Sequence, residues 1–219
     1  MSEKYINLIK SFNEEDYRTS VNLHIHTTFS DGEGNAKSFL EQAKAQGFKN
    51  IAFADHNTLN NYLENGNLLD EDMVIPAIEF DCWDGTVFLH MLGYGIDVHN
   101  EELQAICAKN KRETEADWVR IFSNRHPKNV IQTIHNSGGI AVLAHPACCT
   151  TIFLENFVKK LVSYGLDGME VFYPYKRHRK YIRSCSPNHV KKIAQKYNLI
   201  MTGGTDEHTL NLRPNQYFS

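Results

Sequence analysis

The stretch that decides the fold is residues 22–32, which read Asn-Leu-His-Ile-His-Thr-Thr-Phe-Ser-Asp-Gly. The apolar and β-branched residues from 21 to 25 predict a short buried strand, and the polar, glycine-marked run after them predicts a loop. Alternate side chains of a strand point the same way, so His24 and His26 share one side. With the carboxylate of Asp31, they form a candidate corner of a metal site, because imidazole nitrogen and carboxylate oxygen bind zinc, manganese and iron. The alternative is a pair of hydrogen-bonded histidines beside a turn.

The composition is that of an ordinary globular chain, with 42% hydrophobic and 22% charged residues. A length of 219 residues suits one domain, and the formal charge of -3 gives no global argument for binding nucleic acid or a membrane. Residues 1–20 predict an N-terminal helical extension without a signal-peptide core, and no run approaches the roughly 20 apolar residues of a membrane span. Five cysteines without CxxC spacing fit a reducing compartment. We therefore expect a single cytoplasmic domain over residues 1–219.

Strand and helix signals alternate along the chain. Strands are predicted at residues 21–25, 50–54, 73–80, 86–94, 140–144, 167–172 and 199–203. Asn35 and Gly47 have the character of residues that begin and end a helix, Asp84-Gly85 predicts a hairpin, and Ser186-Pro187 predicts the start of the last helix. This order predicts an α/β fold in which helices cover a parallel sheet, closed or nearly closed into a barrel.

Histidines and carboxylates stand at or just beyond the C-terminal ends of most predicted strands. These residues are His24, His26, His56, Glu79, His145, Glu170, Asp206 and His208. In a barrel such positions converge on one face, which is where barrel active sites lie. The sequence therefore predicts a metal site at the C-terminal face of the strands.

Nine residues are candidate metal ligands: His24, His26, Asp31, His56, Glu79, His90, His145, Asp206 and His208. One zinc ion takes about four protein ligands, so this set implies two or three divalent ions (manganese, zinc or iron) that share carboxylate bridges. Such a centre activates water and neutralises a phosphoryl or carbonyl oxygen. The lack of cysteine in the set argues against a structural zinc site.

Five motifs, in order along residues 22–208, resemble the PHP (polymerase and histidinol phosphatase) domain. They are His24-x-His26 with Asp31-Gly32, Asp55-His56, Glu79 with His90, Ala144-His145-Pro146 and Asp206-x-His208. The Ser-Asp-Gly after His-x-His is similar to the small stand-alone phosphoesterases of that family. The resemblance implies a distorted (β/α)7 barrel with a trinuclear site. It implies one metal on His24, His26, Glu79 and Asp206, a second on Glu79, His90 and His145, and a third on Asp31, His56 and His208.

A basic cluster follows the strand predicted at residues 167–172. It consists of Lys176, Arg177, His178, Arg179, Lys180 and Arg183. Arg177 and Arg179 are candidates to clamp a phosphate, although cations of this kind are mostly surface residues. His178 is the candidate proton donor.

Two carboxylates near the predicted ligands have roles that the sequence leaves open. Glu170 is a further candidate for substrate binding, unless it only pairs with a nearby cation. Asp55 is a catalytic candidate that would orient His56 or a neighbouring ligand, unless it merely caps a turn.

The predicted function is hydrolysis of a small phosphate ester, of nucleotide or histidinol-phosphate type, by a metal-activated hydroxide in a trinuclear site. A metal-dependent hydrolase of an amide or lactone is the first alternative, because activated water is not specific to one bond. A non-catalytic metal-binding module is the second, and it would require broken ligand positions. No serine or cysteine forms a triad-like pattern with histidine and carboxylate, which agrees with metal-based chemistry. The expected partner is a small phosphorylated substrate rather than a membrane or a nucleic-acid polymer.

Overall fold

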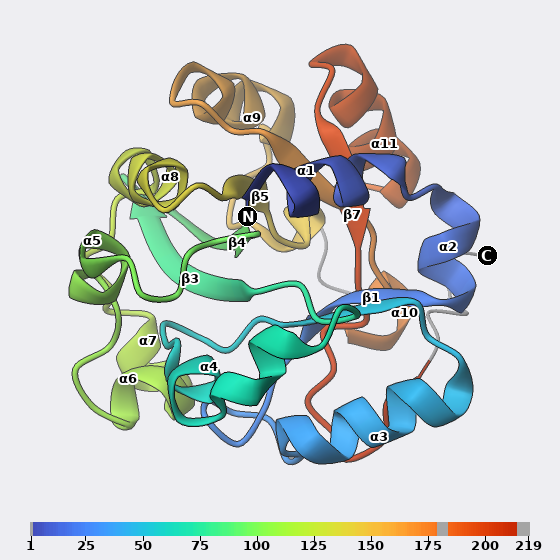
Figure 1. The fold of residues 1–219 in the computed structure, drawn as a ribbon. Helices are drawn as coiled ribbons and strands as arrows, with labels where there is room; N and C mark the ends of the chain where they lie inside the picture. The colour runs from blue at the N-terminus through green and yellow to red at the C-terminus, as the bar shows by residue number, and fades with distance from the viewer. Residues whose placement is uncertain (1, 179–183, 214–219) are drawn as a thin grey trace.

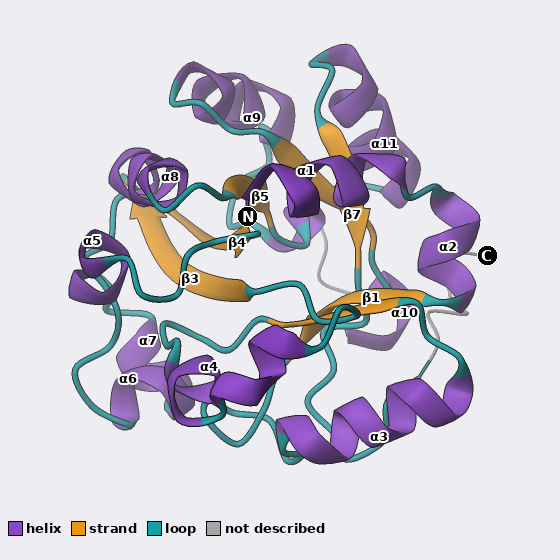
Figure 2. Cartoon of the chain, in the orientation of Figure 1, coloured by secondary structure: helices purple, strands orange, loops and turns teal. Residues whose placement is uncertain are grey.

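The computed structural model describes residues 2–178 and 184–213, and its helices lie around the outside of the strands (Figures 1 and 2). The strands of this described part are β1 (Val21–Ile25), β2 (Asn50–Phe53), β3 (Ala77–Asp84), β4 (Val87–Tyr94), β5 (Ile140–Leu143), β6 (Gly168–Phe172) and β7 (Ile200–Gly203). The longer helices are α1 (Ser2–Ser11), α2 (Glu14–Thr19), α3 (Ala36–Gln46), α8 (Pro127–Asn136), α9 (Leu154–Ser163) and α11 (Pro187–Lys196). Short helical segments are α4 (Asn60–Glu64), η1 (Gly66–Asp70), α5 (Glu101–Ala105), α6 (Arg112–Glu115), α7 (Asp117–Arg120), η2 (Pro146–Cys148) and α10 (Tyr175–His178).

The strands form two sheets. Strands β1 and β2 pair in parallel, and a second sheet has the order β3-β4-β5-β6-β7. Within it β5, β6 and β7 are parallel, whereas β4 runs antiparallel to both of its neighbours. The expectation of a parallel sheet is therefore corrected at this edge. The physical reason is the tight turn at Gly85 and Thr86, where Asp84 pairs with Val87 and the chain folds straight back.

Two isolated bridges join the sheets. Ile25 at the end of β1 pairs with Glu207, which lies beyond β7, and His56, which lies beyond β2, pairs with Glu79 in β3. The mixed α/β fold predicted from the sequence is thus confirmed. Over residues 2–178 and 184–213 the paired strands do not form one continuous closed barrel.

The helix boundaries follow the capping residues. The Asn35 side chain accepts a hydrogen bond from the backbone N–H of Ser38 at 2.9 Å, and Gly47 ends α3 in the left-handed region at a φ of 75°. The Ser186 side chain accepts a hydrogen bond from the backbone N–H of His189 at the start of α11. The helix limits predicted from these residues are confirmed.

Strand β1 shows how the core positions the site. All five of its residues are buried, although only alternate residues are apolar. Leu23 and Ile25 belong to the hydrophobic core, and His24 lies on the opposite side of the strand.

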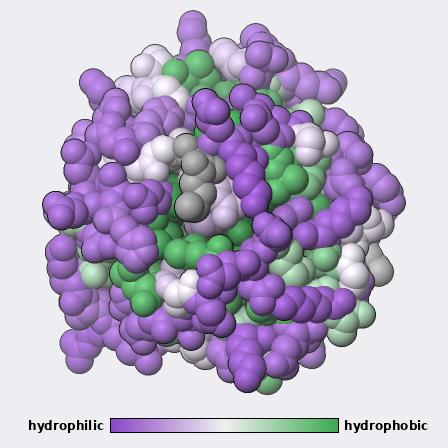
Figure 3. Space-filling model, viewed as in Figure 1, coloured by the Kyte–Doolittle hydropathy of each residue, from purple (hydrophilic) through white to green (hydrophobic). Residues whose placement is uncertain are grey.

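The face of the molecule in Figure 3 is mostly hydrophilic, with hydrophobic residues gathered toward its middle. Among the described residues no helix is long and apolar enough to cross a membrane.

Candidate metal centre

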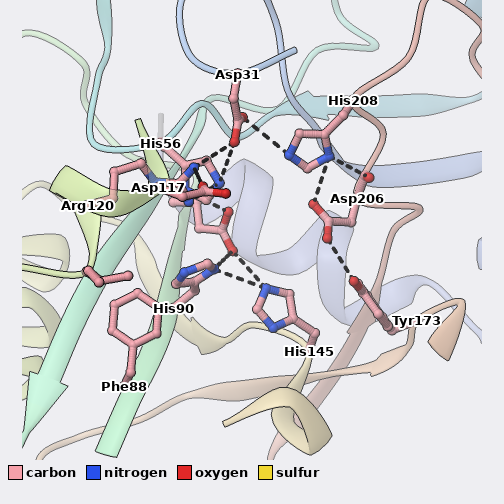
Figure 4. A pocket seen from close by; sticks show the side chains of 12 residues that line it. Asp31, His56, Phe88, His90, Asp117, Arg120, His145, Tyr173, Asp206 and His208 are labelled. Atoms are coloured by element: carbon pink, nitrogen blue, oxygen red, sulfur yellow. Dashed lines mark hydrogen bonds and ion pairs between the residues drawn. The ribbon is translucent and has the colours of Figure 1, made fainter. Parts of the chain in front are cut away.

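A cavity of about 460 Å³ contains the predicted ligands. Seven of the nine line it, and Figure 4 shows the side chains of those that it labels converging from different strands and loops. The other two, His24 and His26, are fully buried against the same carboxylates. The structure therefore brings all nine predicted ligands together.

Glu79 lies at the centre of the ligand set. Its carboxylate oxygens are 3.1–3.3 Å from imidazole nitrogens of His24, His26, His56, His90 and His145. Oε2 faces the first three histidines, and Oε1 faces the other two. A carboxylate with different partners on its two oxygens has the geometry required to bridge two cations.

The strand that carries Glu79 differs from its prediction. A strand over residues 73–80 was expected to end near Glu79, but β3 continues to Asp84. The longer ladder with β4 arises because the hairpin turn begins only after Asp84. Glu79 is therefore an internal strand residue, and Asp81, two positions further on, shares its side of the strand.

Four groups of side chains hold ligand atoms within 4.8 Å of one another. They are His24 with His26 and Asp206; Glu79 with His90 and His145; His26 with Asp31, His56 and His208; and His56 with Asp81 and His90. The first three groups contain the residues that the PHP resemblance implies for three ions, except that Glu79 appears in only one of them. The fourth group depends on Asp81, which was not selected from the sequence.

Several buried ligand atoms lie 3.1–3.3 Å from other ligand atoms but, among the described residues, in no well-aligned hydrogen bond. They include Nε2 of His24, His26 and His90, Oδ1 of Asp31 and Oε2 of Glu79. Poorly aligned hydrogen bonds leave buried polar atoms incompletely satisfied, and a cation shared by these atoms would satisfy them. Nitrogen and carboxylate oxygen donors without thiolate suit manganese, zinc or iron. The residues therefore fit bound divalent ions.

The histidines and carboxylates of the cavity shift one another's pKa values. Burial lowers the pKa of His26, but Asp206 and Glu79 outweigh burial and raise that pKa to about 10. For His90, burial is likewise outweighed by Glu79, and the pKa rises to about 9. Burial also opposes ionisation of Asp206, yet the neighbouring histidines, His24 foremost, hold its pKa well below the usual range. A metal cation bound by these histidines would displace the protons that their raised pKa values favour.

Glu170 in β6 lies behind the ligands rather than in the cavity lining. Its Oε1 is 2.9 Å from Nδ1 of His24, and its Oε2 accepts the backbone N–H of His145 at 2.8 Å. The side chain is fully buried. This geometry fits a residue that keeps Nε2 of His24 turned toward the cavity, and it does not bring Glu170 to the position expected for a substrate contact.

Asp55 serves the loop that follows β1. Its carboxylate accepts hydrogen bonds from the backbone N–H and hydroxyl of Thr27, at 2.7 and 2.8 Å, and from the hydroxyl of Ser30 at 2.7 Å. This loop carries Asp31 into the cavity. Asp55 therefore fits a positioning role for the loop, in place of the contact with His56 considered from the sequence.

Arg120 and Tyr173 line the cavity, and sequence reasoning missed both. Tyr173 donates a hydrogen bond to Oδ2 of Asp206 at 2.8 Å. Arg120 is hydrogen-bonded to His56, and burial together with the arginine charge lowers the pKa of His56 well below its ordinary value. Arg120 comes from a run of short helices without a recognisable motif, so no sequence signal could have selected it.

Most of the basic cluster lies outside the described residues. The side chains of Arg177 and His178, at the end of α10, and the whole of Arg179 lie outside the described residues. Their expected roles as phosphate clamp and proton donor stay predictions.

The fold and the cavity together define a class: a mixed α/β protein whose strands and adjoining loops gather histidines and carboxylates into a metal centre. Within that class, the family model of the PHP domain matches residues 22–164, and the chain belongs to the PHP domain family.

Similar proteins support that assignment. The chain is 26% identical over 254 aligned residues to a protein of Eggerthella lenta named phosphoribosyl 1,2-cyclic phosphate 1,2-diphosphodiesterase, with 85% of this chain and 93% of the relative covered. A candidate metal-dependent phosphoesterase of Bifidobacterium adolescentis has a similar structure, with a TM-score of 0.68, 21% identity and coverage of 87% and 88%. An amidohydrolase of Chromobacterium violaceum, with bound sulfate and no metal, gives a TM-score of 0.69, 18% identity and the same coverage. The solved structures confirm the fold, and the family supports a metal-dependent phosphoesterase, a hydrolase.

Proposed function

We propose that this chain hydrolyses a small phosphate ester in the cavity, with two or three divalent ions held by the nine predicted ligands. The observation that carries the proposal is the central carboxylate of Glu79, which faces different histidines on its two oxygens, among buried ligand atoms that form no well-aligned hydrogen bond. Membership of the PHP family and the name of the Eggerthella lenta relative support a phosphorus–oxygen bond as the target. We also propose that the two sheets are parts of a distorted (β/α)7 barrel, which the two bridges between them support.

Divalent ions bound in such a cavity would supply Lewis acidity and lower the pKa of water. The chain's own residues hold and orient the ligands. Glu170 fixes the tautomer of His24, and Tyr173 holds Oδ2 of Asp206 so that Oδ1 faces Nε2 of His26 at 3.1 Å.

The wall beside His90 is apolar. Phe88 lines the cavity there, and its ring centre is 5.1 Å from that of His90 in an edge-on arrangement; Ile121 adds a second apolar side chain to the cavity lining. Figure 4 shows Phe88 on this side, away from Asp206 and His208. An apolar wall limits water on one side of the site, so a leaving group with an apolar or aromatic part would fit against it.

The test is a screen of metal-reconstituted protein against phosphate esters. Chelated protein is reloaded with manganese, zinc or ferrous iron and incubated with nucleotides, histidinol phosphate, nitrophenyl phosphate and a cyclic sugar phosphate. Released phosphate and opened diester are followed by a colorimetric assay and by chromatography. Turnover should require metal, vanish in Glu79→Gln and persist in Glu71→Gln, which changes a surface carboxylate paired with Lys44. Hydrolysis of amides or lactones without hydrolysis of any phosphate ester would contradict the proposal.

The predicted proton donor can be tested in the same assay. If His178 is a general acid, His178→Ala should lower turnover roughly 100-fold or more on esters with poor leaving groups and should leave metal content intact. The loss should be smaller for nitrophenyl phosphate, whose leaving group needs no proton. Equal losses on good and poor leaving groups would remove the acid role.

A further inference from the structure

Arg120, at the end of α7, points into the cavity toward Asp31 and His56 (Figure 4). Each of its guanidinium nitrogens has a partner there. Nη1 donates to Oδ2 of Asp31 at 2.6 Å, Nη2 donates to Nε2 of His56 at 2.5 Å, and Nε donates to Oδ2 of Asp81 at 3.2 Å. Only 5% of the side chain is exposed. A permanent positive charge is therefore held where the carboxylates of Asp31 and the buried Asp81 meet His56.

These contacts occupy the lone pair that a metal would need from His56. Arg120 cannot accept a hydrogen bond, so Nε2 of His56 is the acceptor and the proton of the neutral ring lies on Nδ1. Nδ1 in turn lies 3.2 Å from Oε2 of Glu79. A neutral imidazole has one lone pair, and a zinc–nitrogen bond of about 2.0–2.1 Å requires it. His56 in this arrangement offers no atom to a metal.

The two ligand groups that contain His56 are both in contact with Arg120. One has Asp31 as its carboxylate and the other has Asp81, and Arg120 donates to both. The two groups without His56 are His24 with His26 and Asp206, and Glu79 with His90 and His145. No hydrogen bond or ion pair found among the described residues joins Arg120 to any member of these two groups.

The segment that carries Arg120 is bonded to strand β3. The hydroxyl of Ser123 donates to the backbone oxygen of Asp81 at 2.7 Å, and the indole N–H of Trp83 donates to the backbone oxygen of Ile121 at 2.7 Å. These bonds lie within three residues of Arg120 on its C-terminal side. The position of the guanidinium is therefore set by the fold and not by a free rotation of a surface side chain.

We infer that the Arg120 guanidinium takes the third cation position of this centre, so that the chain binds two divalent ions where the PHP resemblance implies three. The inference rests on the proposed function only in requiring that the cavity binds metal. Arg120 neutralises Asp31 and Asp81, and the two ions belong to the groups without His56. Asp31, His56 and His208 then form a fixed wall of the site and bind no ion.

The experiment counts metal ions in intact protein. Wild type, Arg120→Met and Arg112→Met are stripped with chelator, dialysed against the same excess of free Mn²⁺ and analysed for manganese per chain. Arg112 is an exposed arginine on α6 and serves as the matched control. We expect two ions in wild type and in Arg112→Met, and three in Arg120→Met. Arg120→Gln, which is neutral and keeps a hydrogen-bonding end, should also bind three and replaces the methionine variant if that does not fold.

The outcomes separate the inference from the proposed function. Three ions in wild type would overturn the inference whatever the variants do, and would leave the phosphoesterase proposal standing. Two ions in the neutral Arg120 variants would also overturn it, because removal of the guanidinium would then have opened no site. A wild-type chain that binds no metal would refute the metal centre itself, and the inference with it.

Discussion

Replacing Glu170 by glutamine should weaken metal binding although Glu170 does not line the cavity. The carboxylate accepts two hydrogen bonds, from Nδ1 of His24 at 2.9 Å and from the backbone N–H of His145 at 2.8 Å. Both donors are buried with it. Glutamine has nearly the same shape, but only one of its two terminal atoms can accept. One of the two donors must therefore face an NH₂ group.

Each orientation of the glutamine has its own cost. If its oxygen faces His24, the N–H of His145 meets another donor, and the buried mismatch costs about 1–3 kcal/mol of folding free energy. If its oxygen faces His145, then Nδ1 of His24 must accept, and the ring proton moves to Nε2. That atom faces Glu79 and Asp206, at 3.2 and 3.5 Å, and is the one that a metal would use. Loss of such an orienting partner lowers metal affinity by about 10–100-fold, or about 1.4–2.8 kcal/mol.

The assay is a chelator competition that gives the affinity of each bound ion, combined with urea unfolding of the stripped protein. Glu170→Gln should lose 10–100-fold in affinity for at least one ion, and Glu71→Gln on the surface should lose none. Turnover at saturating metal should recover in part, because the defect lies in binding. Unchanged metal affinity in a folded Glu170→Gln protein would refute the positioning role of Glu170.

Further expectations concern other parts of the chain. Glu79→Gln should lose more than one equivalent of metal in elemental analysis, because its two oxygens face different histidines; loss of a single equivalent would contradict a bridging role. Gly204→Ala should destabilise the stripped protein by about 1–3 kcal/mol in urea unfolding, because a Cβ there would lie 2.4 Å from Cβ of His24; an unchanged midpoint would contradict this contact. The hydrogen bond and charge of Asp167 raise the pKa of His135, so the pair adds stability that is complete below the ordinary histidine pKa of about 6.5 and is lost as pH rises through the raised value. Asp167→Asn should therefore lower the free energy of unfolding by at most about 1 kcal/mol at pH 5 and less at pH 9, and a difference independent of pH would argue against the ion pair.

Local sequence rules were sufficient for the parts of the site that depend on one strand or one loop. The side-by-side placement of His24 and His26 follows from the two-residue period of β1. The limits of α3 follow from Asn35 and Gly47. The two-residue period of a strand could also have selected Asp81, because it stands two residues after Glu79 on one strand. It was missed because the strand was expected to end at residue 80, before the hairpin turn that sets its real length.

Arg120 was beyond such rules because its neighbouring ion-pair partner, Asp117, is exposed and gives no sign that the guanidinium turns inward. The helix that carries it has four residues and no side-chain cap. What turns Arg120 inward is the attachment of its segment to β3, together with carboxylates that stand 39 and 89 residues earlier in the chain. A contact of that kind depends on tertiary packing alone. Its partners, Asp81 and Asp31, can be recognised only when the strands and loops have been placed.

The ligands lie where the two sheets are joined, and this position links metal binding to the fold. One bridge pairs His56 with Glu79, so two cavity residues form the junction between the extension of β2 and strand β3. The other pairs Ile25 with Glu207, and that junction is flanked by His24 and His26 on one side and by Asp206 and His208 on the other. Ions shared across these junctions would bind the folded chain and not the separated sheets, and would therefore raise the free energy of unfolding. The increase would grow with the logarithm of the ratio of ion concentration to dissociation constant. In the metal-free chain, imidazoles and Arg120 must balance the buried carboxylates at the same junctions. Cations bound at these junctions would therefore also hold the two sheets together.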